Sequence, residues 1–144
     1  MASYFRIIPE HNLVYARYSG TVTIDDYLAV VEGVRDHPDF KVQFKHLIDL
    51  THLTGIKREY IKVMMAQARI AELVAKSTSD ILSVVVAPTP VAMEAASMVI
   101  RSWDKLDTPV VRRIVSDMAE AEALLGCKQG TLPELLNQPG YPLP

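Results

Sequence analysis

The stretch that decides the fold is ILSVVVA at residues 81–87, followed directly by PTP at residues 88–90. A run that is nearly all apolar and rich in valine is typical of a strand covered on both faces of a parallel sheet. Thr89 as N-cap and Pro90 as first helical residue predict that a helix begins immediately after this strand. The pair indicates an α/β domain with helical crossovers.

The segments on either side repeat this order. HLIDL at 46–50 is a second compact strand, and residues 56–76 carry apolar residues at helical spacing. PVVRRIV at 109–115 predicts a strand at the sheet edge because it carries two arginines, and the helix after it, capped by Ser116, should stop at Gly126. Strands joined through helices should lie parallel.

The N-terminal part predicts a different connection. Residues 4–8 and 13–18 are rich in aromatic and β-branched residues and flank PEHN at 9–12, which predicts a β-hairpin. Thr23 should cap a helix that ends before Pro38. We therefore expect a mixed five-stranded sheet, opened by a hairpin and continued by βα units, with four main helices.

One domain is expected over residues 1–126, followed by a proline-rich tail over residues 127–144. The tail holds four of the nine prolines, and only TLPE at 131–134 carries a capping-box pattern that allows a short helical turn. We expect the rest of the tail to be an extended arm.

Composition excludes several classes of protein. A chain of 144 residues that is 49% hydrophobic can form one sizeable core, and a net charge of −2 argues against a dedicated nucleic-acid binder. Cys127 is the only cysteine, which excludes a disulfide scaffold and favours a reducing compartment. No apolar run approaches the roughly 20 residues of a membrane span, and the N-terminus shows no leader pattern, so a cytoplasmic protein is predicted.

The strand end LIDLT at 47–51, placed before a long helix and after an opening hairpin, resembles the SpoIIAA-like and STAS (STAS/SEC14-type) domains over about residues 4–126. The resemblance implies the same fold and a regulatory role. Anti-sigma-factor antagonists of that family carry an Asp-Ser-Ser-Gly-type segment with a phosphorylatable serine. The matching stretch here is HLTG at 52–55, which has no serine, so the chain is more similar to the stand-alone bacterial members.

Ligands of open α/β sheets bind at the carboxyl ends of the strands, where helix N-termini also offer N–H groups to anions. Thr51 and Thr54 would be the phosphoacceptors of a regulatory switch. The competing interpretation is that Thr54, Thr89 and Ser116 are simply helix caps. The ligand or switch region predicted on this basis comprises Asp49, Thr51, His52, Thr54, Lys57 and Thr89.

No metal or cofactor is expected. His46, Asp49 and His52 are spaced by three, but the alternation of a strand sends the first two to opposite faces of the sheet. No nucleophile elbow, phosphate-binding loop or dinucleotide glycine pattern occurs. We therefore assign no catalytic residue, and a small hydrolase-like enzyme that uses His52 with Asp49 is an alternative hypothesis.

The apolar arcs of two helices are unusually wide. At 100° per residue the apolar residues of 56–76 span roughly 220°, against about 100° for a helix that covers one sheet. Either neighbouring helices and the tail cover the excess, or a partner does, most simply a second copy. The interface candidates are Val63, Ile70, Val74, Met93 and Ile100.

These observations favour a non-catalytic regulatory or scaffold domain that acts through protein contact, as a homodimer or with another protein. The main alternative is a module that binds a small anionic or lipid-like ligand of the SEC14 type, for which a pocket between Tyr27, Met64, Met65 and Trp103 would be evidence.

Overall fold

The computed structural model describes residues 3–103 and 108–136. Its strands are β1 (Ser3–Ile8), β2 (Leu13–Tyr18), β3 (Gly20–Val22), β4 (Lys45–Asp49), β5 (Leu53–Ile56), β6 (Ile81–Val86) and β7 (Val110–Val115). Its helices are α1 (Ile24–Asp36), α2 (Tyr60–Val74), α3 (Pro90–Trp103), α4 (Met118–Leu125) and α5 (Thr131–Leu136), and a 3-10 turn covers Pro9–His11.

The main sheet has five strands in the order β1-β2-β4-β6-β7. β1 and β2 form the antiparallel hairpin, and the other neighbours are parallel. Asn12 ends the hairpin turn in the left-handed region at φ 51°, a conformation that asparagine tolerates better than most residues. The mixed five-stranded α/β sheet predicted from the sequence is confirmed, as is the edge position of β7.

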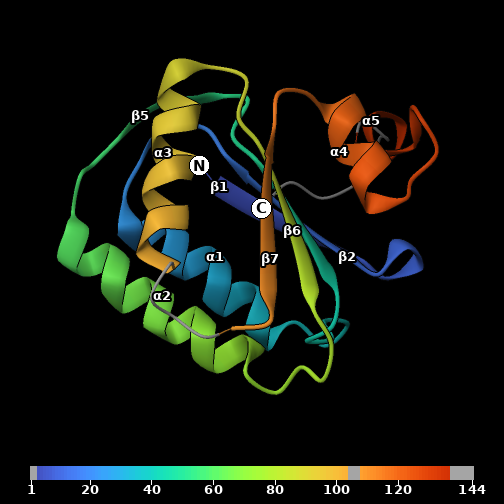
Figure 1. Cartoon of the computed structure of the whole chain (residues 1–144), viewed down its shortest axis with the longest axis horizontal. Coiled ribbons are helices and arrows are strands. Elements are labelled where there is room, and N and C mark those ends of the chain that lie inside the picture. Colours follow the sequence, from blue (N-terminus) through green and yellow to red (C-terminus); the bar gives the residue numbers. More distant parts are fainter. Residues whose placement is uncertain (1–2, 104–107, 137–144) are drawn as a thin grey trace.

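Helices cover both faces of this sheet, as Figure 1 shows. α1, α2 and α3 lie on one side, where Val30, Val34 and Ala95 pack against Val14 and Val85. α4 and α5 lie on the other side, where the core contains Leu47, Val84, Ala121, Leu125 and Leu132. Because alternate residues of β6 enter both cores, its nearly uniform apolar composition is explained.

The caps follow the expected chemistry with one correction. Thr23 and Asp26 form a reciprocal capping box at α1, and the Thr89 hydroxyl accepts from Ala92 N at 3.2 Å at the start of α3. At α4 the cap is Asp117 rather than Ser116, since the Asp117 carboxylate accepts from Glu120 N at 2.8 Å. A carboxylate at this position also interacts favourably with the helix dipole.

The long second helix begins later than the sequence predicts. Residues 53–56 form β5, which pairs in parallel with β3 in a separate two-stranded sheet, so α2 begins at Tyr60. Gly20, at φ 70°, turns the chain out of β2 and donates from its N–H to the His52 carbonyl at 3.1 Å. Thr54 and Gly55 therefore belong to a strand and do not cap a helix.

The beginning of the tail is part of the domain. Residues 131–136 form α5, and Leu132 is fully buried against the sheet. Residues 137–144, where the extended arm is expected, lie outside the described residues. Within residues 3–103 and 108–136, no helix is both long enough and apolar enough to cross a bilayer.

Candidate functional site

Asp49, at the carboxyl end of β4, is buried and accepts three hydrogen bonds. The Tyr15 hydroxyl donates to Oδ2 at 2.7 Å, and Thr51 donates to Oδ1 from its backbone N at 3.0 Å and from its hydroxyl at 2.5 Å. Burial and the Asp49 charge raise the pKa of Tyr15, so that its hydroxyl stays protonated and can donate. Both carboxylate oxygens of Asp49 are therefore used in holding the strand end.

This arrangement bears on the enzyme hypothesis. His52 is exposed in the turn after β4, and in the described part of the chain Asp49 bonds to Tyr15 and Thr51 and not to His52. An acid–base pair needs a hydrogen bond that orients the histidine. The structure does not form one between these two residues.

The remaining residues of the predicted switch region are spread over separate elements. Thr54 is exposed on β5, six positions before α2, so a phosphate there would not meet that helix N-terminus. A phosphate on Thr51 would stand beside the Asp49 carboxylate and be repelled by it. Lys57 extends β5, with its N–H on the Val22 carbonyl at 3.2 Å, and Thr89 caps α3. Of the six residues, only Asp49 and Thr51 are brought together by a hydrogen bond.

His46 lies on the opposite face of β4 from Asp49. It lines a cavity beneath α1–α3, whereas Asp49 faces Tyr15 on the α4 side. The expectation that the strand separates these two side chains is confirmed. Among the described residues, no three His, Cys, Asp or Glu side chains are close enough to hold a metal ion.

The cavity beneath α1–α3 has a volume of about 150 Å³. Its walls are mainly aliphatic side chains from β2, β4 and β6 and from the three helices. The polar residues of the lining include Tyr18, Thr23, Tyr27 and Lys57. Three others, His46, Ser83 and Arg112, are register partners on β4, β6 and β7. These three residues, called the polar row below, were not assigned a role from the sequence. The signal that could have found them is polar residues at inward positions of otherwise apolar strands.

Burial controls the protonation of the polar row. Desolvation, helped by the nearby Arg112 charge, lowers the pKa of His46 to about 4. Desolvation also lowers the pKa of Arg112 to about 10. At neutral pH the row therefore consists of a neutral imidazole, a hydroxyl and a guanidinium cation.

His46 should make the protein sensitive to acid. Its pKa of about 4 in the folded state lies below the 6.5 of an unfolded histidine, so the unfolded chain takes up the proton first as pH falls. The contribution to stability is fully present above pH 6.5 and is lost as pH falls toward 4, by up to about 3 kcal/mol. Urea unfolding at pH 7 and at pH 4.5 should show this loss, and His46→Gln should reduce it; an equal loss in both proteins would contradict the assignment.

α2 presents an exposed apolar surface, which we call the α2 patch. It consists of Tyr60, Ile61, Met64 and Met65, exposed by 62%, 77%, 68% and 62%. Four of the six exposed large hydrophobic residues among the described residues lie here; the other two are Met93 and Leu124. A contiguous apolar patch on a surface helix marks an interaction site.

The structure corrects three of the five interface candidates. Val63, Ile70 and Val74 are buried within the chain, where they pack beneath α2, so they offer no surface to a partner. Ile100 is half-buried and lines the cavity. Met93 on α3 is the candidate that remains exposed, at 42%.

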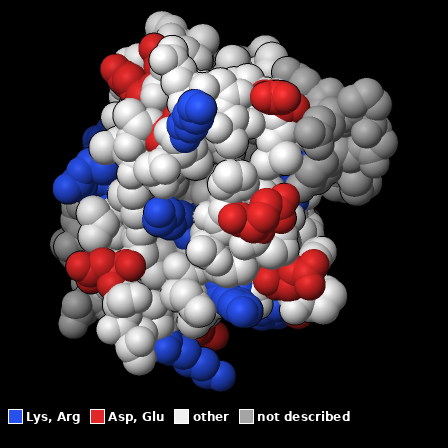
Figure 2. Space-filling view, turned by 90° about the vertical axis from the view of Figure 1, so that its right-hand side faces the viewer, with Lys and Arg blue, Asp and Glu red and all other residues white. Residues whose placement is uncertain are grey.

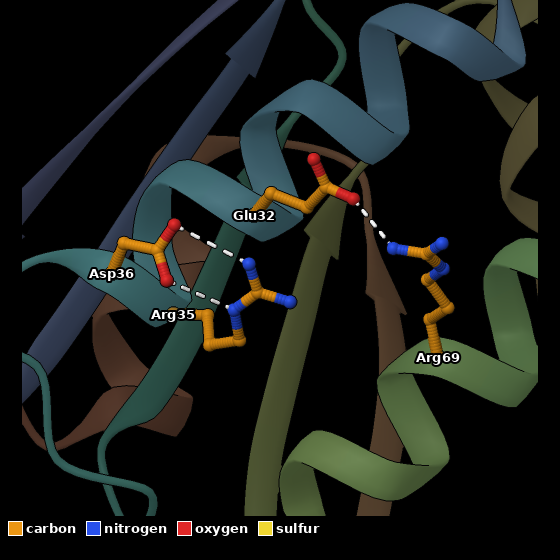
Figure 3. Close-up of polar contacts among 4 residues, drawn as sticks. All are labelled: Glu32, Arg35, Asp36 and Arg69. Carbon is orange, nitrogen blue, oxygen red and sulfur yellow. Dashed lines mark hydrogen bonds and ion pairs between the residues drawn. The ribbon is translucent and has the colours of Figure 1, made fainter.

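Three basic residues on or beside α2 are paired with acids of the same chain. Arg69 contacts Glu32 of α1 at 2.6 Å, as Figure 3 shows, and Lys62 contacts Glu59 at 3.0 Å and Asp25 at 3.5 Å. Arg58 pairs with Glu94 of α3. As exposed ion pairs these contacts add little stability, but they neutralise these three cations beside the patch.

The pocket expected between Tyr27, Met64, Met65 and Trp103 does not form as such. Tyr27 lines the cavity, but both methionines are on the outer surface of α2. The Trp103 side chain lies outside the described residues.

The face on the α4 side mixes basic and acidic side chains without a large patch of one sign (Figure 2).

The sequence matches no protein-family model and no curated protein. The α2 patch and the cavity with its polar row are therefore the features from which we infer a function.

Proposed function

We propose that this protein is a non-catalytic regulatory or scaffold domain of SpoIIAA-like type, which acts through protein contact and pairs with a second copy of itself through the α2 patch. The observation that carries the proposal is the continuous exposure of Tyr60, Ile61, Met64 and Met65 on one helix face. Leaving these side chains in water forgoes roughly 1.5–3 kcal/mol each of favourable burial. The opening hairpin and the βα order support the SpoIIAA-like part of the proposal.

Charge favours a second copy over a charged partner. Lys62 and Arg69 border the patch, and both are already neutralised by acids of the same chain. In a two-fold symmetric dimer the same patch of both copies forms the interface. Unpaired charges of one sign on that patch would therefore face each other and repel. Because Lys62 and Arg69 are paired, that repulsion is reduced, and these two cations offer little attraction to an acidic protein or an anionic membrane.

The patch also has the composition of an interface centre. Tyrosine and methionine are enriched in protein interfaces, and methionine adapts its shape to the opposing surface. A standard interface covers roughly 800 Å² on each partner, which a helix face with its flanks can supply.

Sedimentation of the full chain over a range of concentrations tests the proposal. The wild type should shift from monomer to dimer as its concentration rises, and Ile61→Glu should stay monomeric because it would bury an unpaired charge. Leu124→Glu is the matched control, since it places the same charge on an exposed leucine of α4. A wild type that stays monomeric up to its solubility limit, or equal dimers in both variants, would contradict the proposal.

A further inference from the structure

We propose that the cavity beneath α1–α3 is a binding site for a small carboxylic acid with a short aliphatic or aromatic body, whose carboxylate lies on the polar row and whose body lies between the sheet and the helices. This site is separate from the α2 patch, which is on the outer side of the same helix. The binding proposal can therefore be tested independently of the proposed dimer.

The placement of the polar row is the first argument. His46, Ser83 and Arg112 are consecutive partners across three parallel strands, so their Cα atoms lie on one line, about 4.8 Å apart from strand to strand. All three line the cavity. A hydroxyl, an imidazole N–H and a guanidinium on one wall are the donors that suit a carboxylate.

The position of Arg112 is the second argument. Its guanidinium is held in a mainly apolar environment, as the lowering of its pKa to about 10 by desolvation reflects. A partly desolvated cation attracts an anion more strongly than an exposed one does, because screening by water is weaker. Arg112 has five N–H donors, so it can receive a ligand carboxylate alongside another contact.

The size and walls of the cavity limit the rest of the ligand. A cavity of about 150 Å³ in a protein core accommodates an aromatic ring or a short alkyl chain. Branched aliphatic side chains such as Val30, Val85 and Val99 form much of its wall. A two-chain lipid or a nucleotide would not fit, which restricts the class to small amphiphilic acids.

The polar row lies at a different place from the switch region that the sequence predicts. The polar row lies near the amino-terminal ends of β4, β6 and β7, because His46, Ser83 and Arg112 are the second or third residues of their strands. The switch region was placed at the carboxyl ends of the same strands. The site we propose is therefore a buried face site rather than one at the edge of the sheet.

The test uses hexanoate and hexan-1-ol as probes, followed by amide chemical shifts of the full chain. Hexanoate should shift residues of the cavity wall, and Arg112→Met should weaken its binding by about tenfold or more, since a charge-assisted hydrogen bond is lost. Arg113→Met is the matched control, because Arg113 is the next residue of β7 and is exposed. Hexan-1-ol should bind the wild type and Arg112→Met about equally.

A second variant keeps the proposal testable if Arg112→Met does not fold. Val85→Ile adds one methylene group to the cavity wall and should weaken both probes while the polar row is unchanged. Binding of hexanoate that responds equally to Arg112→Met and Arg113→Met would overturn the proposal. The proposal would also be overturned if hexanoate, added up to its solubility limit, shifted no amide signal of a cavity residue. Shifts confined to residues on the outer surface would overturn it too.

Discussion

Glu122→Ala is expected to lower the free energy of unfolding by about 3 kcal/mol and to detach α5 from the domain. Glu122 is buried on α4, and its carboxylate accepts from Gly130 N at 3.1 Å and from Leu132 N at 2.8 Å. Alanine would leave both N–H groups without this acceptor, and a buried Leu132 would lose the contact that fixes its backbone. Urea unfolding and hydrogen exchange of the Leu132 amide measure the two effects.

Glu122→Gln separates the hydrogen bonds from the negative charge. Its side-chain carbonyl can accept one of the two bonds, so its loss of stability should be about half that of the alanine variant. Equal losses in the two variants would show that the charge and not the acceptor geometry matters. Unchanged exchange of the Leu132 amide in Glu122→Ala would contradict the role assigned to this residue.

Asp49→Ala is expected to have a comparable effect, a loss of about 3–4 kcal/mol, at the carboxyl end of β4. It would remove the acceptor of the buried Tyr15 hydroxyl and the two bonds from Thr51. A buried hydroxyl without a partner is costly because water cannot replace the lost acceptor. Chemical denaturation at neutral pH measures the change.

Asp49→Asn and Tyr15→Phe divide this loss into its parts. Asparagine keeps an oxygen that can accept from Thr51, so it should cost less than alanine. Tyr15→Phe removes only the 2.7 Å bond and should cost about 1–2 kcal/mol. If Asp49→Ala lowered the free energy of unfolding no more than a typical surface substitution does, the hydrogen bonds of Asp49 would not be what holds the end of β4 in place.

The order of the main elements could be predicted because it depends on local signals. The apolar run of β6, the caps at Thr23 and Thr89 and the stop at Gly126 each act within a few residues. β5 was missed because its pairing with β3 joins segments more than 30 residues apart. Nothing within residues 53–56 distinguishes a short edge strand from the start of a helix.

The candidate sites depend on information that periodicity does not contain. The sequence shows the wide apolar arc of α2, but it does not show which half of that arc faces the core. The structure buries the branched Val63, Ile70 and Val74 and exposes the α2 patch. The polar row consists of residues from three separate strands, and only the register of the sheet shows that they are neighbours.

Methyl signals of the methionines provide the most direct measurement of the α2 patch as an interface. With ¹³C-methyl-methionine, dilution of the full chain should shift the Met64 and Met65 signals together, since both methyl groups leave the contact as the dimer separates. Met118 packs against the core on the α4 side and should not shift. Met64 and Met65 signals that stay constant over the whole dilution series would contradict self-association through the α2 patch.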